Sequence, residues 1–234
     1  MSTENLFSES LDIFFNYDYN FIEIVIVSLK ISLSATIIAS LISIPLASLL
    51  SVKSFPGRYL LIIFTNTLTA LPPVVVGLFL YILFSNQGVF GLYDLLYTIE
   101  IMIIAQTILI TPVLITLTKE TIDKCYNEYR DYLHSLRIQN RKMIYTLIWE
   151  SRYSLITNIL VGLGRGLSEV GAIIIVGGNI AHLTRTMTTG IVLETSKGDL
   201  SLAISLGIAL LSIAFFINII IFVIKYMGEN KYNP

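Results

Sequence analysis

The stretch ISLSATIIASLISIPLASLLSV, residues 31–52, contains 22 residues without a formal charge between Lys30 and Lys53. As a helix it would rise about 33 Å, which is enough to cross the roughly 30 Å hydrocarbon core of a bilayer. Further uncharged stretches lie at 59–93, 101–118 and 200–224. This repeated exclusion of charge predicts a protein that crosses a membrane several times.

The composition excludes most soluble classes of protein. Charged residues are 13% of the chain, about half of the roughly 25% in an average globular protein, and hydrophobic residues reach 55%. A soluble chain of 234 residues cannot hide so much apolar surface from water. Fifteen Lys and Arg balance sixteen Asp and Glu, so no overall field attracts nucleic acid.

Hydropathy predicts an all-α integral membrane protein with five transmembrane helices. We expect them near residues 22–50, 59–84, 99–118, 153–178 and 200–225, with the fourth carrying two charges, Arg165 and Glu169. Eleven of the fifteen Lys and Arg fall on one side if the N-terminus lies outside the cell. The positive-inside rule therefore predicts an external N-terminus and a cytoplasmic C-terminus.

The longest inner segment, residues 119–152, contains neither Gly nor Pro. Its apolar residues recur at helical spacing, first around Leu133 and then around Leu147. This pattern predicts one or two short amphipathic helices at the inner face of the membrane. The alternative is a solvated connector whose basic residues only anchor the topology.

Two parts of this segment, DYLHSLR at 131–137 and LIWE at 147–150, resemble the cytoplasmic loop of ABC importer permeases. The family pattern is roughly Glu-Ala-Ala, three residues, Gly, nine residues and then Ile-x-Leu-Pro. Here Asp131 stands for the glutamate, Arg137 for the glycine and Trp149-Glu150 for the last pair. The family's glycine permits a tight bend in the loop, because glycine tolerates a positive φ. Arginine tolerates it poorly, so we expect the bend in this chain to be gentler or shifted to Gln139-Asn140, where asparagine accepts the left-handed conformation.

Other motifs extend the resemblance over most of the chain. PPVVVGL at 72–78, GRGLSEVGA at 164–172 and VGGNI at 176–180 resemble segments of molybdate- and tungstate-type permeases. TRTMTT at 184–189 and LETSKGD at 193–199 are most similar to tungstate permeases. The resemblance implies a type I permease fold, a single permease domain over residues 1–234, and import of tungstate or a similar oxyanion across the cell membrane.

The resemblance also implies partners. A second permease copy would form a homodimer in the lipid membrane, two ATPase subunits would bind at the cytoplasmic face, and an oxyanion-binding protein would dock outside. The ATPase contact is expected at Asp131, Tyr132, Leu133, His134, Ser135, Leu136, Arg137 and Ile138. The chain has no G-x-x-x-x-G-K-[ST] loop, so ATP and Mg²⁺ are expected on the ATPase and no cofactor on this chain.

The fourth span carries the sharpest candidate residues. A charge at bilayer depth costs at least about 2.5 kcal/mol and marks a functional residue by default. Because a bare carboxylate repels an anion, Glu169 is expected to act as a gate or to orient the helix. A structural pair with Arg165, four residues earlier, is the alternative. Helical steps also place Gly164, Ser168 and Gly171 on one arc, which predicts a close contact with another helix.

Pro72-Pro73 should kink or unwind the second span, because proline removes a backbone donor. Broken helices are tolerated in membranes where the freed carbonyls face protein or a water-filled cavity. We therefore expect pathway-lining or gating roles for Pro72, Pro73, Arg165, Glu169, Gly177, Gly178 and Asn179. A simple packing kink is the alternative for the proline pair.

The outer segment 179–199 is rich in hydroxyl groups and is expected to be a loop. Hydroxyl and guanidinium donors suit a deprotonated tetrahedral oxyanion. Contact with the oxyanion or with the binding protein is therefore expected at Thr184, Arg185, Thr186, Thr188 and Thr189. Docking candidates on the same reasoning are Glu194, Lys197 and Asp199, for each of which a solvated face is the alternative. The alternative is a solvated loop in which a threonine caps a short helix.

Neither catalysis nor metal binding is expected of this chain. His134 and His182 fall on opposite sides of the predicted membrane and cannot share a metal, and Cys125 is expected to be an inert thiol. Two alternatives remain: a permease for another small solute, such as molybdate or sulfate, and a membrane-embedded enzyme. An enzyme would need clustered acids or histidines at the membrane surface, whereas the acids here are scattered.

Overall fold

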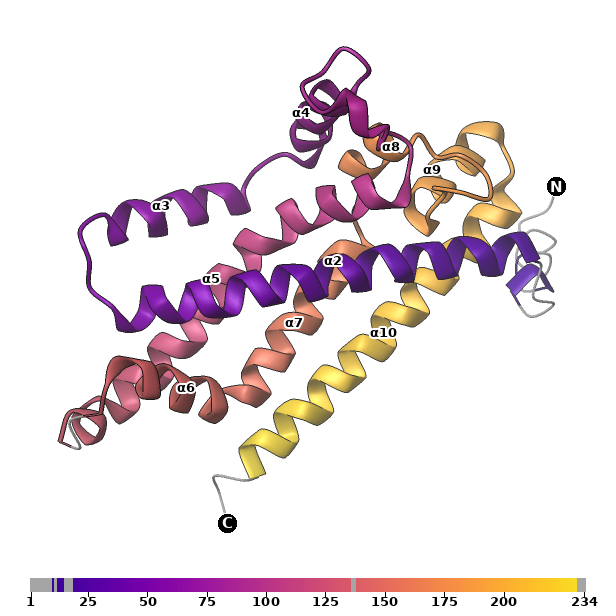
Figure 1. The fold of residues 1–234 in the computed structure, drawn as a ribbon. Coiled ribbons are helices and arrows are strands. Elements are labelled where there is room, and N and C mark those ends of the chain that lie inside the picture. The colour runs from indigo at the N-terminus through magenta and orange to yellow at the C-terminus, as the bar shows by residue number, and fades with distance from the viewer. Residues whose placement is uncertain (1–9, 11, 15–18, 136–137, 231–234) are drawn as a thin grey trace.

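The computed structural model describes residue 10 and residues 12–14, 19–135 and 138–230 (Figure 1). Within these ranges the chain forms helices and turns and no strand. The elements from Tyr19 onward are α2 (Tyr19–Val52), α3 (Arg58–Thr69), α4 (Pro73–Phe84), the 3₁₀ turn η1 (Gly91–Tyr93), α5 (Ile99–Ser135), α6 (Asn140–Glu150), α7 (Arg152–Leu167), α8 (Gly171–Gly177), α9 (Met187–Lys197) and α10 (Leu200–Asn230).

Three single helices, α2, α5 and α10, are long and apolar enough to cross a membrane. Two bent pairs pass the same test, α3 with α4 at 98° and α7 with α8 at 59°. The five predicted spans correspond to these three helices and two bent pairs. A break within 59–84 was predicted, whereas the expectation of one helix over 153–178 was wrong, because that segment breaks after Leu167.

The break between α3 and α4 follows from the two prolines. Pro72 adopts an extended backbone with φ −64° and ψ 124°, and Pro73 begins α4. A residue before proline is driven out of the helical region, whereas proline itself fits the first helical position. The predicted unwinding at Pro72-Pro73 is therefore confirmed.

The third span is longer than predicted. α5 continues for 17 residues past Thr118 to Ser135, because no Gly or Pro interrupts that stretch. α6 folds back and packs on this extension through Ile122, Leu133, Met143 and Leu147. We call the two segments, residues 119–135 and 140–150, the α5–α6 hairpin. Gln139 is extended and Asn140 starts α6, so neither residue has the positive φ of a tight glycine-like bend.

α5 lies at the centre of the described chain (Figure 1). α2 packs along most of its length, and α3, α4, α7 and α8 also contact it. Ala35 and Ala39 of α2 are fully buried against Ile110 and Leu114 of α5, because small side chains let the two backbones approach closely. α10 lies at the edge, and only 11% of its most apolar window is buried. Exposed Phe215 and Phe216 on that helix suit contact with lipid rather than water.

The two bent pairs meet where α4 contacts α8. A Cβ atom added at Gly77 would lie 2.9 Å from the Ala172 Cα, closer than such atoms approach in proteins. Gly162 and Gly166 of α7 face side chains of α5, with an added Cβ 2.9 Å from Leu114 and 3.0 Å from Ile110, whereas a Cβ at Gly164 would meet nothing within 4 Å. The predicted arc of Gly164, Ser168 and Gly171 does not form one interface, because the break turns α8 away from α7.

Replacing Gly77 with alanine should destabilise the protein although alanine is the better helix former. The added methyl group meets backbone atoms of α8 that cannot move aside, and overpacking of this kind costs about 1–3 kcal/mol. Gly164→Ala is the matched control, because it gains helix propensity at an open position. Thermal unfolding in detergent should show a lower midpoint for Gly77→Ala only. Equal midpoints would contradict the close contact.

Candidate functional site

Glu169 lies in the break between α7 and α8 and caps the second helix. Its Oε1 accepts hydrogen bonds from the backbone N–H groups of Val170 at 3.1 Å and Gly171 at 3.0 Å. A carboxylate at a helix N-terminus satisfies donors that have no partner within the helix. The ion pairs found among the described residues include none between Glu169 and Arg165. Of the roles considered for Glu169, this geometry matches the helix-orienting one.

The carbonyl groups at the same break also have side-chain partners. The Gln106 amide of α5 donates to the Gly166 carbonyl at 2.9 Å, and the Thr188 hydroxyl of α9 donates to the Glu169 carbonyl at 2.8 Å. Gln106 is 1% exposed, and its Oε1 has no partner among the described residues. The break is thus tied to α5 on one side and to α9 on the other.

Sequence reasoning missed Gln106. The one available signal was an amide in the middle of the apolar run 101–118. A polar side chain at that depth is costly unless it finds a partner inside the protein. Such a residue therefore marks a position where the backbone of another helix needs a donor.

The segment 179–199 contains a helix rather than an open loop. Thr186 caps α9 by accepting from the Thr189 N–H, while the Thr189 hydroxyl accepts from the Thr186 N–H. Gly198 ends the helix with φ 85°. The predicted capping threonine is confirmed, and the expectation of a loop was wrong because this capping box starts a helix.

The threonine side chains face inward. Thr184, Thr186, Thr188 and Thr189 are all buried. Thr184 donates to the Gly177 carbonyl, and Thr189 donates to the Asn179 Oδ1 at 2.9 Å. Gly178 and Asn179 have positive φ and turn the chain at the end of α8. These hydroxyls therefore hold α9 onto α8, and in this structure they do not form the exposed surface expected of a binding loop.

Arg185 points to an acid on the same segment. Its Nη1 lies 3.7 Å from the Glu194 Oε1, and the Lys197 ammonium lies 3.0 Å from the same oxygen. Glu194 is only 4% exposed, so it is an internal partner of two cations. The expectation that Glu194 offers a docking surface was wrong for this reason.

Arg165 is the exception among the charged residues near the break. It lies in the last turn of α7, its side chain is exposed, and it has no ion pair among the described residues. Thirteen residues separate it from Arg152 at the start of α7, which corresponds to roughly 20 Å along the helix axis. An unpaired guanidinium at that depth needs water, an anion or another protein chain beside it.

The proline break lies beside the break at Glu169. A Cβ added at Gly171 would lie 3.4 Å from the Val74 backbone nitrogen, so the first turns of α4 and α8 are in contact. The structure thus brings together two groups of predicted pathway residues, Pro72 and Pro73 with Glu169, while Gly177, Gly178 and Asn179 lie at the far end of α8.

The predicted ATPase contact divides into inward and outward residues. Asp131, Tyr132 and Ser135 are exposed, whereas Leu133 is 3% exposed and packs inside the α5–α6 hairpin. Ile138 packs against the same cluster. Leu136, Arg137 and the side chain of His134 lie outside the described residues. The hairpin's own packing therefore leaves Asp131, Tyr132 and Ser135 as its outward-facing members.

Within the described part of the chain, no group of three or more His, Cys, Asp or Glu side chains could hold a metal ion. The three long helices and two bent pairs define a polytopic, all-helical integral membrane protein.

Comparison with known proteins gives the family. The chain is 35% identical over 216 residues to the tungstate uptake system permease protein TupB of Peptoclostridium acidaminophilum, covering 92% of this chain and 95% of that protein. It is 36% identical over 222 residues to TupB of Campylobacter jejuni, covering 92% and 90%. A probable anion ABC transporter permease protein of Haloferax volcanii is 33% identical over 202 residues, covering 84% and 87%. No family model matches the chain.

The chain therefore belongs to the permease subunits of ABC transporters, in the group that includes the molybdate- and tungstate-type importers. Members of this family are translocation components rather than enzymes.

Replacing Thr188 with valine should loosen the break. The change keeps the shape of the side chain but leaves the Glu169 carbonyl without its donor, a loss of about 1–3 kcal/mol for a buried group. Hydrogen exchange at the N–H groups of residues 169–172 should become faster. Thr195→Val removes an exposed hydroxyl from the same helix and should leave exchange unchanged. Equal exchange in the two variants would refute the tie between α9 and the break.

Proposed function

We propose that this chain is the membrane-spanning subunit of an ATP-driven importer for tungstate or a similar tetrahedral oxyanion. The names of the relatives in Peptoclostridium acidaminophilum and Campylobacter jejuni support tungstate. A sulfate transport system permease protein of Salmonella typhimurium, 26% identical over 201 residues, supports the wider oxyanion class.

The observation that carries the proposal is Arg165, which is exposed in the last turn of α7, just before the break at Glu169, and has no ion pair among the described residues. A guanidinium attracts a dianion and offers several N–H donors in one plane. The nearby acid, Glu169, accepts hydrogen bonds from backbone N–H groups at the start of α8, so its role is structural. In our proposal Arg165 lines the pathway and makes a transient contact with the oxyanion, while Glu169 and the prolines fix the two breaks.

The partners follow from the family. An ABC transporter includes ATPase subunits and, in importers, a binding protein for the solute. We propose a homodimer of this chain with two ATPase subunits that hold ATP and Mg²⁺, and with an oxyanion-binding protein outside. Asp131, Tyr132 and Ser135 are exposed on the α5–α6 hairpin and are the proposed contact with the ATPase.

We also propose that the N-terminus is external and the C-terminus cytoplasmic. Lys and Arg are concentrated in the α5–α6 hairpin and in the turn between α2 and α3, which would then lie inside. The turn around η1 and the outer segment with α9 would lie outside.

Replacing Arg165 with glutamine should lower oxyanion uptake by about tenfold or more, because the pathway loses the only positive charge that we assign to it. The measurement is tungstate uptake, with molybdate and sulfate as competitors, in vesicles holding the permease, its ATPase and a loaded binding protein. Lys225→Gln, at an exposed cation of α10 outside the hairpin, is the control and should retain uptake. If the wild-type complex hydrolysed ATP without any response to these oxyanions, the proposed function would be wrong.

Two cysteine variants test the orientation. In a Cys125→Ser background the chain has no other cysteine, so Leu92→Cys and Tyr132→Cys each carry a single thiol. Both positions are well exposed, at 97% and 64%. A membrane-impermeant thiol reagent should label the first variant in intact cells and the second only in inverted vesicles. The reverse pattern would place the N-terminus inside.

A further inference from the structure

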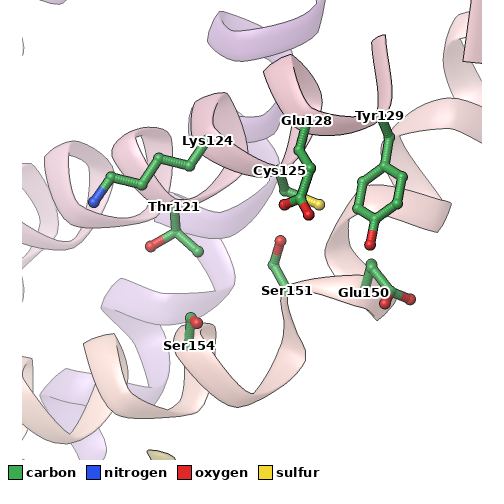
Figure 2. Close-up of a pocket in the computed structure, with 8 residues that line it drawn as sticks. All are labelled: Thr121, Lys124, Cys125, Glu128, Tyr129, Glu150, Ser151 and Ser154. Atoms are coloured by element: carbon green, nitrogen blue, oxygen red, sulfur yellow. The ribbon is translucent and has the colours of Figure 1, made fainter. Parts of the chain in front are cut away.

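A pocket of about 330 Å³ lies between the polar half of α5 and the junction of α6 with α7 (Figure 2). Lys124, Cys125, Glu128 and Tyr129 line it from α5, and Glu150 and Ser151 line it from the junction. A second hollow of about 240 Å³ adjoins it and shares Tyr129 and Glu150. The pocket belongs to the base of the α5–α6 hairpin, beyond the apolar part of α5.

The pocket has a negative field, because Glu128 and Glu150 face it from different helices. Burial raises the pKa of the Cys125 thiol, and the carboxylates of Glu150 and Glu128 add to the rise. Burial and the same two carboxylates also raise the pKa of the Tyr129 phenol. Both groups line the pocket together with the two acids and feel the negative charge of each.

The cations near the pocket are directed elsewhere. Lys119 pairs with Asp123. The Arg152 guanidinium lies over the rings of Trp149 and Tyr153, at 5.0 and 4.6 Å from their centres. In Figure 2 the Lys124 side chain extends away from Glu128, and no ion pair joins these two residues in the part of the chain that the structure describes. Lys124 thus lines the pocket without pairing with Glu128, which has no ion pair among the described residues.

Ser151 supplies an independent sign of a missing partner. It is 7% exposed and occupies the position before α7, where a serine usually caps the helix, yet its side chain makes no capping bond. Its hydroxyl has no nitrogen or oxygen partner among the described residues, and only the weakly interacting Cys125 thiol lies near it. Figure 2 shows this hydroxyl pointing into the pocket, toward Cys125 and Glu128.

We propose that this pocket receives a basic side chain, arginine in preference to lysine, from the ATPase subunit. A guanidinium can pair with a carboxylate through two parallel N–H···O bonds and still donate to a hydroxyl such as that of Ser151. The inference rests on the proposed function, because that function requires an ATPase at this face. It adds a second contact, separate from Asp131, Tyr132 and Ser135 near the end of α5.

Affinity measurements with the full-length permease in nanodiscs and its cognate ATPase test the proposal. Glu128→Arg should raise the Kd by about tenfold or more, because it places a like charge against the incoming cation. Glu120→Arg is the matched control, since Glu120 is an exposed acid on the same helix outside the pocket, and it should bind as the wild type does. Ser151→Ala should also weaken binding without lowering the unfolding temperature, because its hydroxyl supports no helix.

A charge exchange identifies the partner. Changing one Arg or Lys of the ATPase to Glu should restore binding to Glu128→Arg and weaken binding to the wild-type permease. Equal Kd values for Glu128→Arg and Glu120→Arg would overturn the proposal, as would an effect of Glu128→Arg confined to pairing of two permease copies. Oxyanion-stimulated ATP hydrolysis by the wild-type complex is measured in parallel, so a failure of the proposed function is seen separately.

Discussion

A backbone inside a bilayer must find all of its hydrogen-bond partners within the protein, and the rest of this structure depends on how that demand is met at one break. Between α7 and α8 the freed N–H groups turn to the Glu169 carboxylate, and the freed carbonyls turn to Gln106 and Thr188. These partners come from α5 and α9. The break between α7 and α8 therefore helps to hold α5 and α9 in position.

The need for backbone hydrogen-bond partners also gives the two charged residues of the fourth span, Glu169 and Arg165, different roles. Glu169 serves as a helix cap, where a negative charge is favourable, and so it is not a bare acid. Arg165, four residues earlier, has no such task and remains exposed. Hydropathy alone treats Glu169 and Arg165 as two equivalent charges in one span. In the structure the first is hydrogen-bonded to the backbone and the second is exposed. That arrangement suits a permease whose substrate is an anion.

Much of the fold could be predicted from the sequence, because charge exclusion and proline act locally. The five apolar segments and the break at Pro72-Pro73 follow from such local rules. The break at Glu169 could not be predicted in this way. It depends on hydrogen bonds from Gln106 of α5 and Thr188 of α9, which are distant from it in the chain. The burial of Thr184 and Leu133 likewise depends on which segments fold back on them, and hydroxyl content or helical periodicity does not reveal that.

The contact of Gly77 with Ala172 has a mechanical consequence. α4 and α8 belong to different spans and each lies beyond a bend, so each could in principle swing on its own. At Gly77 the two backbones approach closely, and around that point Val76 and Leu80 of α4 pack with Ala172 and Ile173 of α8, so a turn of one short helix should carry the other with it. A movement at the break between α3 and α4 should then be transmitted to the break between α7 and α8.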